Sequence, residues 1–65
     1  MKAAMRWFVE IIQERQPQTR LEECASLREA REMAEQAEGR SDFDSSTDSI
    51  AIYRGETWLT AKLFE

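Results

Sequence analysis

The first segment of the chain alternates apolar and mostly polar positions in the way of an extended strand. Over residues 5–12 one face of such a strand would carry four apolar side chains, Met5, Trp7, Val9 and Ile11. The opposite face is partly apolar too, because Phe8 and Ile12 lie on it. Pro17 cannot donate to a strand ladder, so we expect this strand to end near Glu14 in a polar turn.

A helical pattern follows over residues 27–38. Ser26 and Glu29 have the spacing of a capping box, in which each side chain binds the backbone N–H of the other residue. Apolar residues then recur every three or four positions as Leu27, Ala30, Met33, Ala34 and Ala37. Gly39 is placed to end the helix in a left-handed conformation. Residues 20–25 could extend this helix backwards or form a short strand, and the position of Leu21 off the apolar stripe favours the strand.

The C-terminal third predicts a polar loop and a hairpin. Residues 42–49 are rich in Asp and Ser, which favour turns, and Phe43 is their one aromatic residue. Two strands, over residues 49–53 and 57–64, would flank a tight turn at Arg54 and Gly55. We therefore predict one α+β domain over residues 1–65, in the order β-(β)-α-β-β. Its single helix would pack on a mostly antiparallel sheet of three or four strands.

Strand alternation also predicts which side chains the helix covers. The covered face would take Trp7, Val9, Ile11, Ile50, Ile52, Leu59 and Leu63. The other face would keep five large residues, Phe8, Ile12, Tyr53, Trp58 and Phe64. Such an apolar face favours an interface, and a homodimer is one function that it supports. The alternative is a slip of one residue in a strand register, which would exchange the faces.

Composition narrows the class of protein. With 42% hydrophobic residues the chain has enough apolar material to fold, and no apolar run is long enough to span a membrane. The start of the sequence lacks the apolar stretch of a signal peptide, and a single cysteine, Cys24, allows no internal disulfide. We expect a cytoplasmic protein in which Cys24 is part of the core, with a thiol pKa raised by Glu22 and Glu23.

The residues for catalysis are largely missing from this sequence. It has no histidine, one cysteine and no glycine-rich phosphate loop, so we predict that the protein is not an enzyme and needs no cofactor. Asp42, Asp44, Ser46 and Asp48 stand at alternate positions, like the first ligands of a calcium-binding EF-hand loop. Thr47 and Tyr53 occupy the positions where that loop requires Gly and Glu, so we expect no metal site. Direct binding to nucleic acid is also not expected, because the net charge is −4.

Acidic residues are concentrated in one stretch of the sequence. Six of them lie between positions 32 and 48, against Arg40 alone: Glu32, Glu35, Glu38, Asp42, Asp44 and Asp48. They could be a solvated helix face and loop, or a surface that attracts a basic protein.

A very short acidic chain with one helix, a small sheet and a strip of carboxylates resembles the small inhibitor proteins of phages and mobile elements. Anti-CRISPR proteins are the best-known group among them, and the resemblance rests on size, charge and whole-chain pattern. It implies an inhibitor that mimics or blocks nucleic acid on a basic partner, such as a subunit of a CRISPR effector complex. In such an inhibitor the six carboxylates would face basic residues of the partner, and Phe43 would anchor the contact. The alternative is a small adaptor that forms homodimers through its aromatic sheet face.

Overall fold

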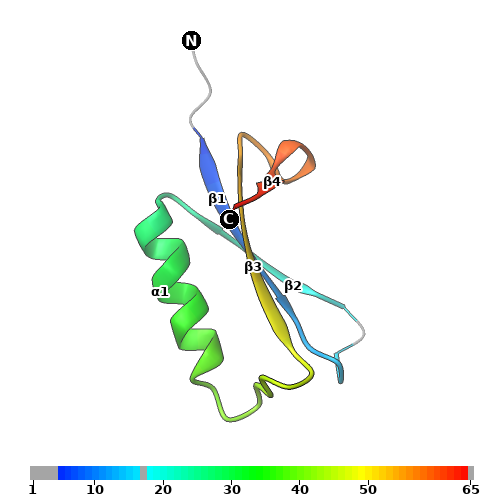
Figure 1. Cartoon of the computed structure of the whole chain (residues 1–65). Helices are drawn as coiled ribbons and strands as arrows, with labels where there is room; N and C mark the ends of the chain where they lie inside the picture. Colours follow the sequence, from blue (N-terminus) through cyan, green and yellow to red (C-terminus); the bar gives the residue numbers. More distant parts are fainter. Residues whose placement is uncertain (1–4, 17, 65) are drawn as a thin grey trace.

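The described part of the protein is an antiparallel sheet of four strands with one α-helix across one face (Figure 1). This computed structural model describes residues 5–16 and 18–64, so the start of the chain, Pro17 and Glu65 lie outside the described residues. The polar turn expected near Glu14 is present at Glu14 and Arg15, where the Gln16 N–H donates to the Gln13 carbonyl at 3.0 Å. Along the chain the elements are β1 (Arg6–Ile12), β2 (Arg20–Cys24), α1 (Leu27–Glu38), β3 (Ser49–Gly55), the 3₁₀ turn η1 (Trp58–Thr60) and β4 (Lys62–Leu63). The predicted α+β class is confirmed.

The strands stand in the order β2-β1-β3-β4. Five consecutive residue pairs join β1 to β2, and seven join β1 to β3. The strand favoured for residues 20–25 is confirmed over Arg20–Cys24. β1 ends at Ile12, two residues before the expected Glu14, whose backbone N–H instead donates to the Asp48 carboxylate at 3.1 Å.

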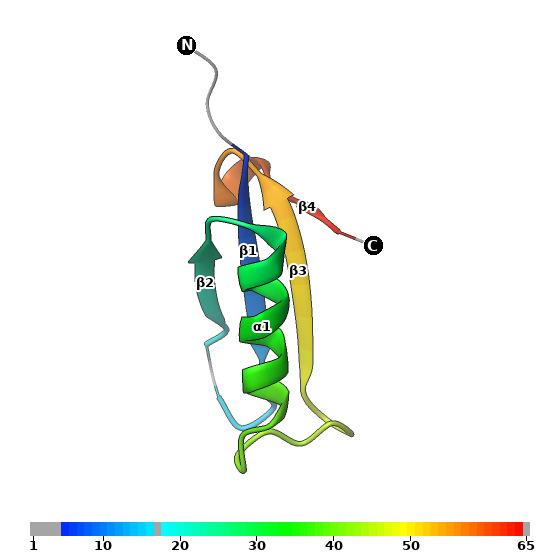
Figure 2. The same cartoon turned by 90° about the vertical axis from the view of Figure 1, so that its left-hand side faces the viewer.

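The core lies between α1 and the strands beneath it. α1 crosses the sheet over β1, between β2 and β3 (Figure 2). Its alanines allow a close approach to the sheet, and the buried cluster consists of Val9, Ile11, Cys24, Ala30 and Ala37. Four half-buried residues pack around this cluster: Trp7, Met33, Ile50 and Ile52. The covered face predicted for β1 and β3 is therefore confirmed, and residues of a 12-residue helix complete it.

The ends of α1 differ in detail from the prediction. Ser26 Oγ accepts a hydrogen bond from the Glu29 N–H at 3.2 Å, as a capping box requires. The Glu29 carboxylate accepts from the N–H of Ala25 at 2.9 Å, one residue before the expected donor. The predicted left-handed Gly39 is wrong, because its φ is −81°. The Gly39 N–H bonds to the Glu35 carbonyl at 3.1 Å, so the last turn simply continues into the following bend.

The C-terminal hairpin is shorter than predicted. Residues 58–60 form the turn η1, and β4 has only two residues, so the expected strand over residues 57–64 is mostly wrong. The hydroxyl of Thr60 accepts from the Thr57 N–H at 3.2 Å and lies 3.1 Å from the Thr57 hydroxyl. These local bonds compete with strand pairing and hold the turn. Gly55 is required here, because a Cβ on it would lie 2.5 Å from the Cα of Ala61.

The turn η1 also covers part of the sheet face that points away from α1. Trp58 packs against Phe8 and Tyr53, with ring centroids 5.9 Å and 4.9 Å away, and Phe8 is only 3% exposed. Phe8 is therefore not available as part of an exposed interface, and for Phe8 that prediction is wrong.

Phe64 and Leu63 lie on the faces of the sheet opposite to those predicted for them. Phe64 lies on the helix side, because its N–H donates to the Ile52 carbonyl at 2.7 Å and its ring meets Trp7 at 5.1 Å between centroids. Leu63 pairs opposite Tyr53 on the other side, and Leu59 is 94% exposed rather than covered. The 3₁₀ turn replaces the assumed continuous strand and shifts the register, which exchanges the faces.

Within residues 5–16 and 18–64, no helix is long and apolar enough to cross a membrane.

Candidate protein-binding surface

The acidic residues predicted to bind a partner gather toward one end of an elongated molecule. Its principal dimensions are 42 × 22 × 17 Å. α1 runs toward this end, the loop 39–48 closes it, and η1 and β4 lie at the opposite end (Figures 1 and 2). We call this region the acidic surface, formed by Glu32, Glu35, Glu38, Asp42, Asp44 and Asp48. Within it, Glu38 at the end of α1 and Asp48 in the loop line the same hollow, together with Phe43.

On α1 the acidic side chains point to solvent. Glu35 and Glu38 are exposed, and within the described residues neither takes part in an ion pair or a side-chain hydrogen bond. Glu32 pairs with Arg28 one turn earlier at 3.4 Å. A rise of about 1.5 Å per residue spaces these three carboxylates by about 4.5 Å along the helix axis. The C-terminal half of α1 is therefore the part whose negative charge is not paired.

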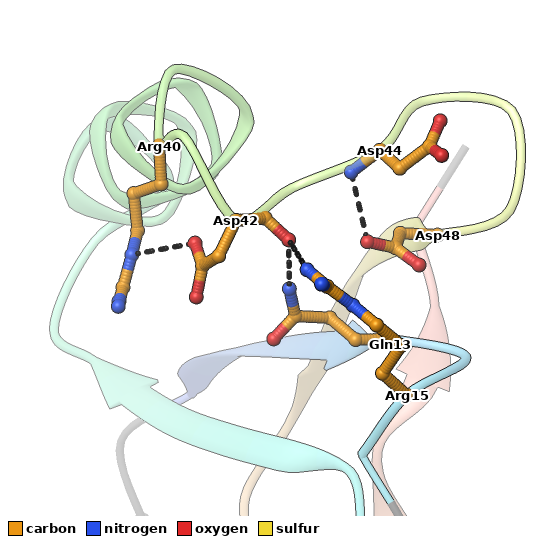
Figure 3. Close-up of polar contacts among 6 residues, drawn as sticks. All are labelled: Gln13, Arg15, Arg40, Asp42, Asp44 and Asp48. Carbon is orange, nitrogen blue, oxygen red and sulfur yellow. Dashed lines mark hydrogen bonds and ion pairs between the residues drawn. The ribbon is translucent and has the colours of Figure 1, made fainter.

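In the loop the Asp48 carboxylate joins two backbone segments. One oxygen accepts from the Glu14 N–H at 3.1 Å. The other accepts from the Asp44 N–H at 2.9 Å, as Figure 3 shows. Thr47 donates its hydroxyl to the same carboxylate at 3.0 Å. These bonds to its charged form hold the pKa of Asp48 below its ordinary value, with the Asp44 N–H as the main cause. Asp48 thereby fixes the loop to the turn that follows β1.

Asp44 organises the tip of the loop. Its carboxylate accepts from the hydroxyl of Ser46 at 2.6 Å and from the Ser46 N–H at 2.9 Å. The Ser46 hydroxyl, and then its N–H, lower the pKa of Asp44. The Asp44 carbonyl also accepts from the Asp48 N–H at 2.7 Å. Asp44 stays ionised at neutral pH, and its oxygens are held in place.

Asp42 is fixed mainly through its backbone. Its carbonyl accepts from Gln13 Nε2 at 3.0 Å and from Arg15 Nη2 at 3.1 Å, and its carboxylate pairs with Arg40 at 3.3 Å (Figure 3). Sequence reasoning missed Gln13 and Arg15 as parts of this surface. They lie 29 and 27 positions from Asp42 along the chain, and no local pattern signals such a contact.

Phe43 lies partly beneath the loop. It is half-buried and lines a small hollow together with Ile11 and Ala37. A wider, open hollow of about 540 Å³ lies on the loop beside Arg15, Asp42 and Asp44. The ring therefore packs on the end of the core with one side accessible, which is a weaker anchor than a projecting aromatic residue.

The second predicted interface, on the sheet face away from α1, keeps only part of its predicted residues. Phe8 is buried and Phe64 lies on the other face, which leaves Ile12 and Trp58, 39% and 37% exposed, and the half-buried Tyr53. Leu21 and Leu63, which were not predicted for this face, lie on it and are 39% and 54% exposed. The Tyr53 hydroxyl donates to Glu10 at 3.2 Å across this face. Burial, followed by that hydrogen bond, raises the pKa of Tyr53.

Cys24 belongs to the core, as predicted. It is 3% exposed, and its Sγ lies 4.0 Å from Met33 Sδ. Burial is the main cause that raises the pKa of the Cys24 thiol, and nearby Glu29, Glu22 and Glu23 raise it further.

Among residues 5–16 and 18–64, no group of three or more Cys, Asp or Glu side chains is arranged to hold a metal ion. Comparisons with protein-family models, with curated proteins and with solved structures found no match to this chain.

Proposed function

We propose that this protein is a non-enzymatic inhibitor whose acidic surface docks onto a basic protein surface of the kind that holds nucleic acid. By occupying that surface it would exclude DNA or RNA from its partner. The observation that carries the proposal is the pair of exposed carboxylates, Glu35 and Glu38, at the C-terminal end of α1, because the fold gains nothing from their charge.

The helix dipole makes this placement unfavourable for stability. The C-terminus of a helix carries partial negative charge, so an acid in the last turn costs up to about 1 kcal/mol at an exposed site. The last turn of α1 contains no basic residue to offset Glu35 and Glu38. Carboxylates that interact unfavourably with the helix dipole do not help the protein to fold. Binding to a cationic partner explains their presence better.

The loop supplies carboxylates that are already fixed. Asp44 and Asp48 keep their positions through backbone hydrogen bonds, so a partner that binds them does not have to order them. Their lowered pKa keeps them ionised down to acidic pH. Together with the exposed Glu35 and Glu38 they form a negative region, which would draw in a cationic groove over about 8–10 Å.

The test is capture of a partner from nuclease-treated bacterial lysate, with the wild-type chain compared with the double variant E35K/E38K. We expect a protein that elutes with rising salt and that the variant binds at least about tenfold more weakly. The captured protein is then purified, and its binding to DNA or RNA is measured by gel shift with and without this chain. Loss of the nucleic-acid complex on addition of the chain is the expected result.

A matched control uses the opposite end of the molecule. Glu56 is exposed beside Arg54 and Lys62, so E56K changes the charge by the same amount as E38K but away from the acidic surface. We expect E56K to retain the partner and E38K to lose affinity. A partner whose binding is insensitive to salt, or equally sensitive to both variants, would contradict the proposal.

A further inference from the structure

The strand β2 forms an open edge of the sheet. It stands last in the order β2-β1-β3-β4, and within the described residues no strand lies beyond it. α1 passes over β1 and leaves this edge uncovered (Figure 2). Its five residues pair one to one with β1, so no bulge bends it away. An edge of this kind offers unpaired backbone groups to a further strand.

Charge decides which strand fits this edge. β2 reads Arg20, Leu21, Glu22, Glu23 and Cys24. In an antiparallel pair of two copies related by a two-fold axis, directly opposite residues point to the same face of the sheet. An axis at Arg20, Glu22 or Glu23 would place that residue opposite its own copy, with like charges in contact. An axis at Cys24 would pair only the end of the strand.

An axis at Leu21 removes these conflicts. It places Arg20 opposite the partner's Glu22, and by symmetry Glu22 opposite the partner's Arg20. Opposite charges then face each other twice, and Leu21 meets its own copy at the axis. Cross-strand pairs of both kinds stabilise antiparallel sheets.

The surroundings of β2 leave room for this pairing. Arg20 and Glu22 lie on the helix side and pair with each other at 2.9 Å, with 57% and 35% of their side chains exposed. Beside them, between β2 and α1, is a hollow of about 310 Å³ with Met33 and Ala37 in its lining. Leu21 lies on the other side of the sheet and is 39% exposed. The four charges would therefore gather on one face and the two leucines on the other.

We propose that two copies of this chain pair through β2, with Leu21 at the two-fold axis, and form one continuous antiparallel sheet. This dimer does not rest on the proposed inhibitor function, because α1 carries the exposed glutamates and β2 forms the contact. It also differs from a dimer through the aromatic face, since it uses an edge of the sheet.

The test mixes two charge variants of the full chain. R20E and E22R each place like charges opposite each other in their own dimers, so each raises the dimer dissociation constant about tenfold. In a mixture of the two variants, both carboxylates of the R20E strand, at positions 20 and 22, lie opposite the two guanidinium groups of the E22R strand. We expect the mixture to form heterodimers with a dissociation constant within about threefold of the wild type. Sedimentation velocity and native mass spectrometry measure both quantities.

The internal pair Arg20–Glu22 is lost in both variants, so it cannot explain a recovery on mixing. The matched control is the pair Arg28–Glu32 on the outer face of α1, 3.4 Å apart in one chain. R28E and E32R should leave the dissociation constant unchanged, alone and mixed. A wild-type chain that stays monomeric up to about 1 mM, or variants that do not recover on mixing, would overturn the proposal.

A covalent readout checks the register. In L21C the two new thiols would face each other at the axis, within the reach of a disulfide. Mild oxidation should therefore convert most of the L21C chain to a covalent dimer, whereas the native Cys24 is buried and stays reduced. In E23C the new thiol would lie opposite the partner's Thr19, so little crosslinking is expected. Equal crosslinking of both variants would also overturn the proposed register.

Discussion

The two halves of the acidic surface carry the same charge but have different roles. The glutamates of α1 have exposed carboxylates, and those of Glu35 and Glu38 touch no cation or backbone donor in the described part of the chain. In the loop, the carboxylates of Asp44 and Asp48 accept hydrogen bonds from backbone N–H groups. A run of acids that looks uniform in the sequence therefore combines unpaired charge with loop-forming charge.

Side-chain length and backbone state explain the difference. Inside a helix the backbone N–H groups are already paired, so a glutamate there has nothing local to bind and extends into water. In a turn the N–H groups are free, and the short Asp side chain reaches those two to four positions away. Asp44 binds Ser46, and Asp48 binds Asp44, in this way.

The largest effect should come from D48A. Because Asp48 holds both the Glu14 and the Asp44 N–H groups, its removal should detach the loop from the turn after β1. We expect the unfolding temperature to fall by several degrees, with faster hydrogen exchange at both amides, as measured by circular dichroism and NMR. D42A is the control within the loop, because its carboxylate binds only Arg40 and its backbone contacts remain. A D48A variant as stable as D42A would remove the distinction between the two halves.

A smaller effect should appear in the dependence of stability on pH. The pKa values of Asp44 and Asp48 are lowered by folding from an ordinary value of 3.8. The unfolded chain then binds protons first, so their stabilisation is complete above about pH 4 and is lost as pH falls through the lower folded values. Urea unfolding between pH 2 and pH 7 should show this loss in the wild type. The loss should persist in E35Q/E38Q and flatten in D44N/D48N; identical profiles would contradict the assignment.

The smallest effect has the opposite sign. Replacing Glu38 by Lys puts a positive charge where the helix dipole is negative, so E38K should stabilise the fold by about 0.3–1 kcal/mol at low salt. Urea unfolding at low and high salt measures the gain, which salt should reduce. E56K has no helix end to complement and should change stability less. If E38K proves destabilising, the Glu38 carboxylate of the wild type has a structural partner. Glu38 would then stabilise the fold, as the loop aspartates do.

The sequence could predict the structural features that depend on contacts between residues close together in the chain. It could not predict those that depend on contacts between distant residues. The helix was predicted to the residue, because Ser26, Glu29 and the alanine stripe act within a few positions of each other. The partners of the loop could not be predicted, since the bond between Asp48 and Glu14 spans 34 positions.

The position of Trp58 could not be predicted either. Its aromatic ring and neighbouring threonines favour a strand by propensity, and only the bonds between Thr57 and Thr60 turn the chain there. The acidic surface was thus predictable in composition, and its division into two roles was not.

The close contact between Gly55 and Ala61 gives the fold a recognisable signature. Any side chain at position 55 would collide with the backbone of residue 61, so substitutions there require the strand end and the following turn to separate. Most surface positions of so small a domain can diverge freely, whereas position 55 cannot. A distant descendant that had exchanged its charges and its loop would still need a glycine at the end of its third strand and a tight approach six residues later. A glycine at the end of this strand, followed six residues later by the backbone that packs against it, would therefore identify such a relative.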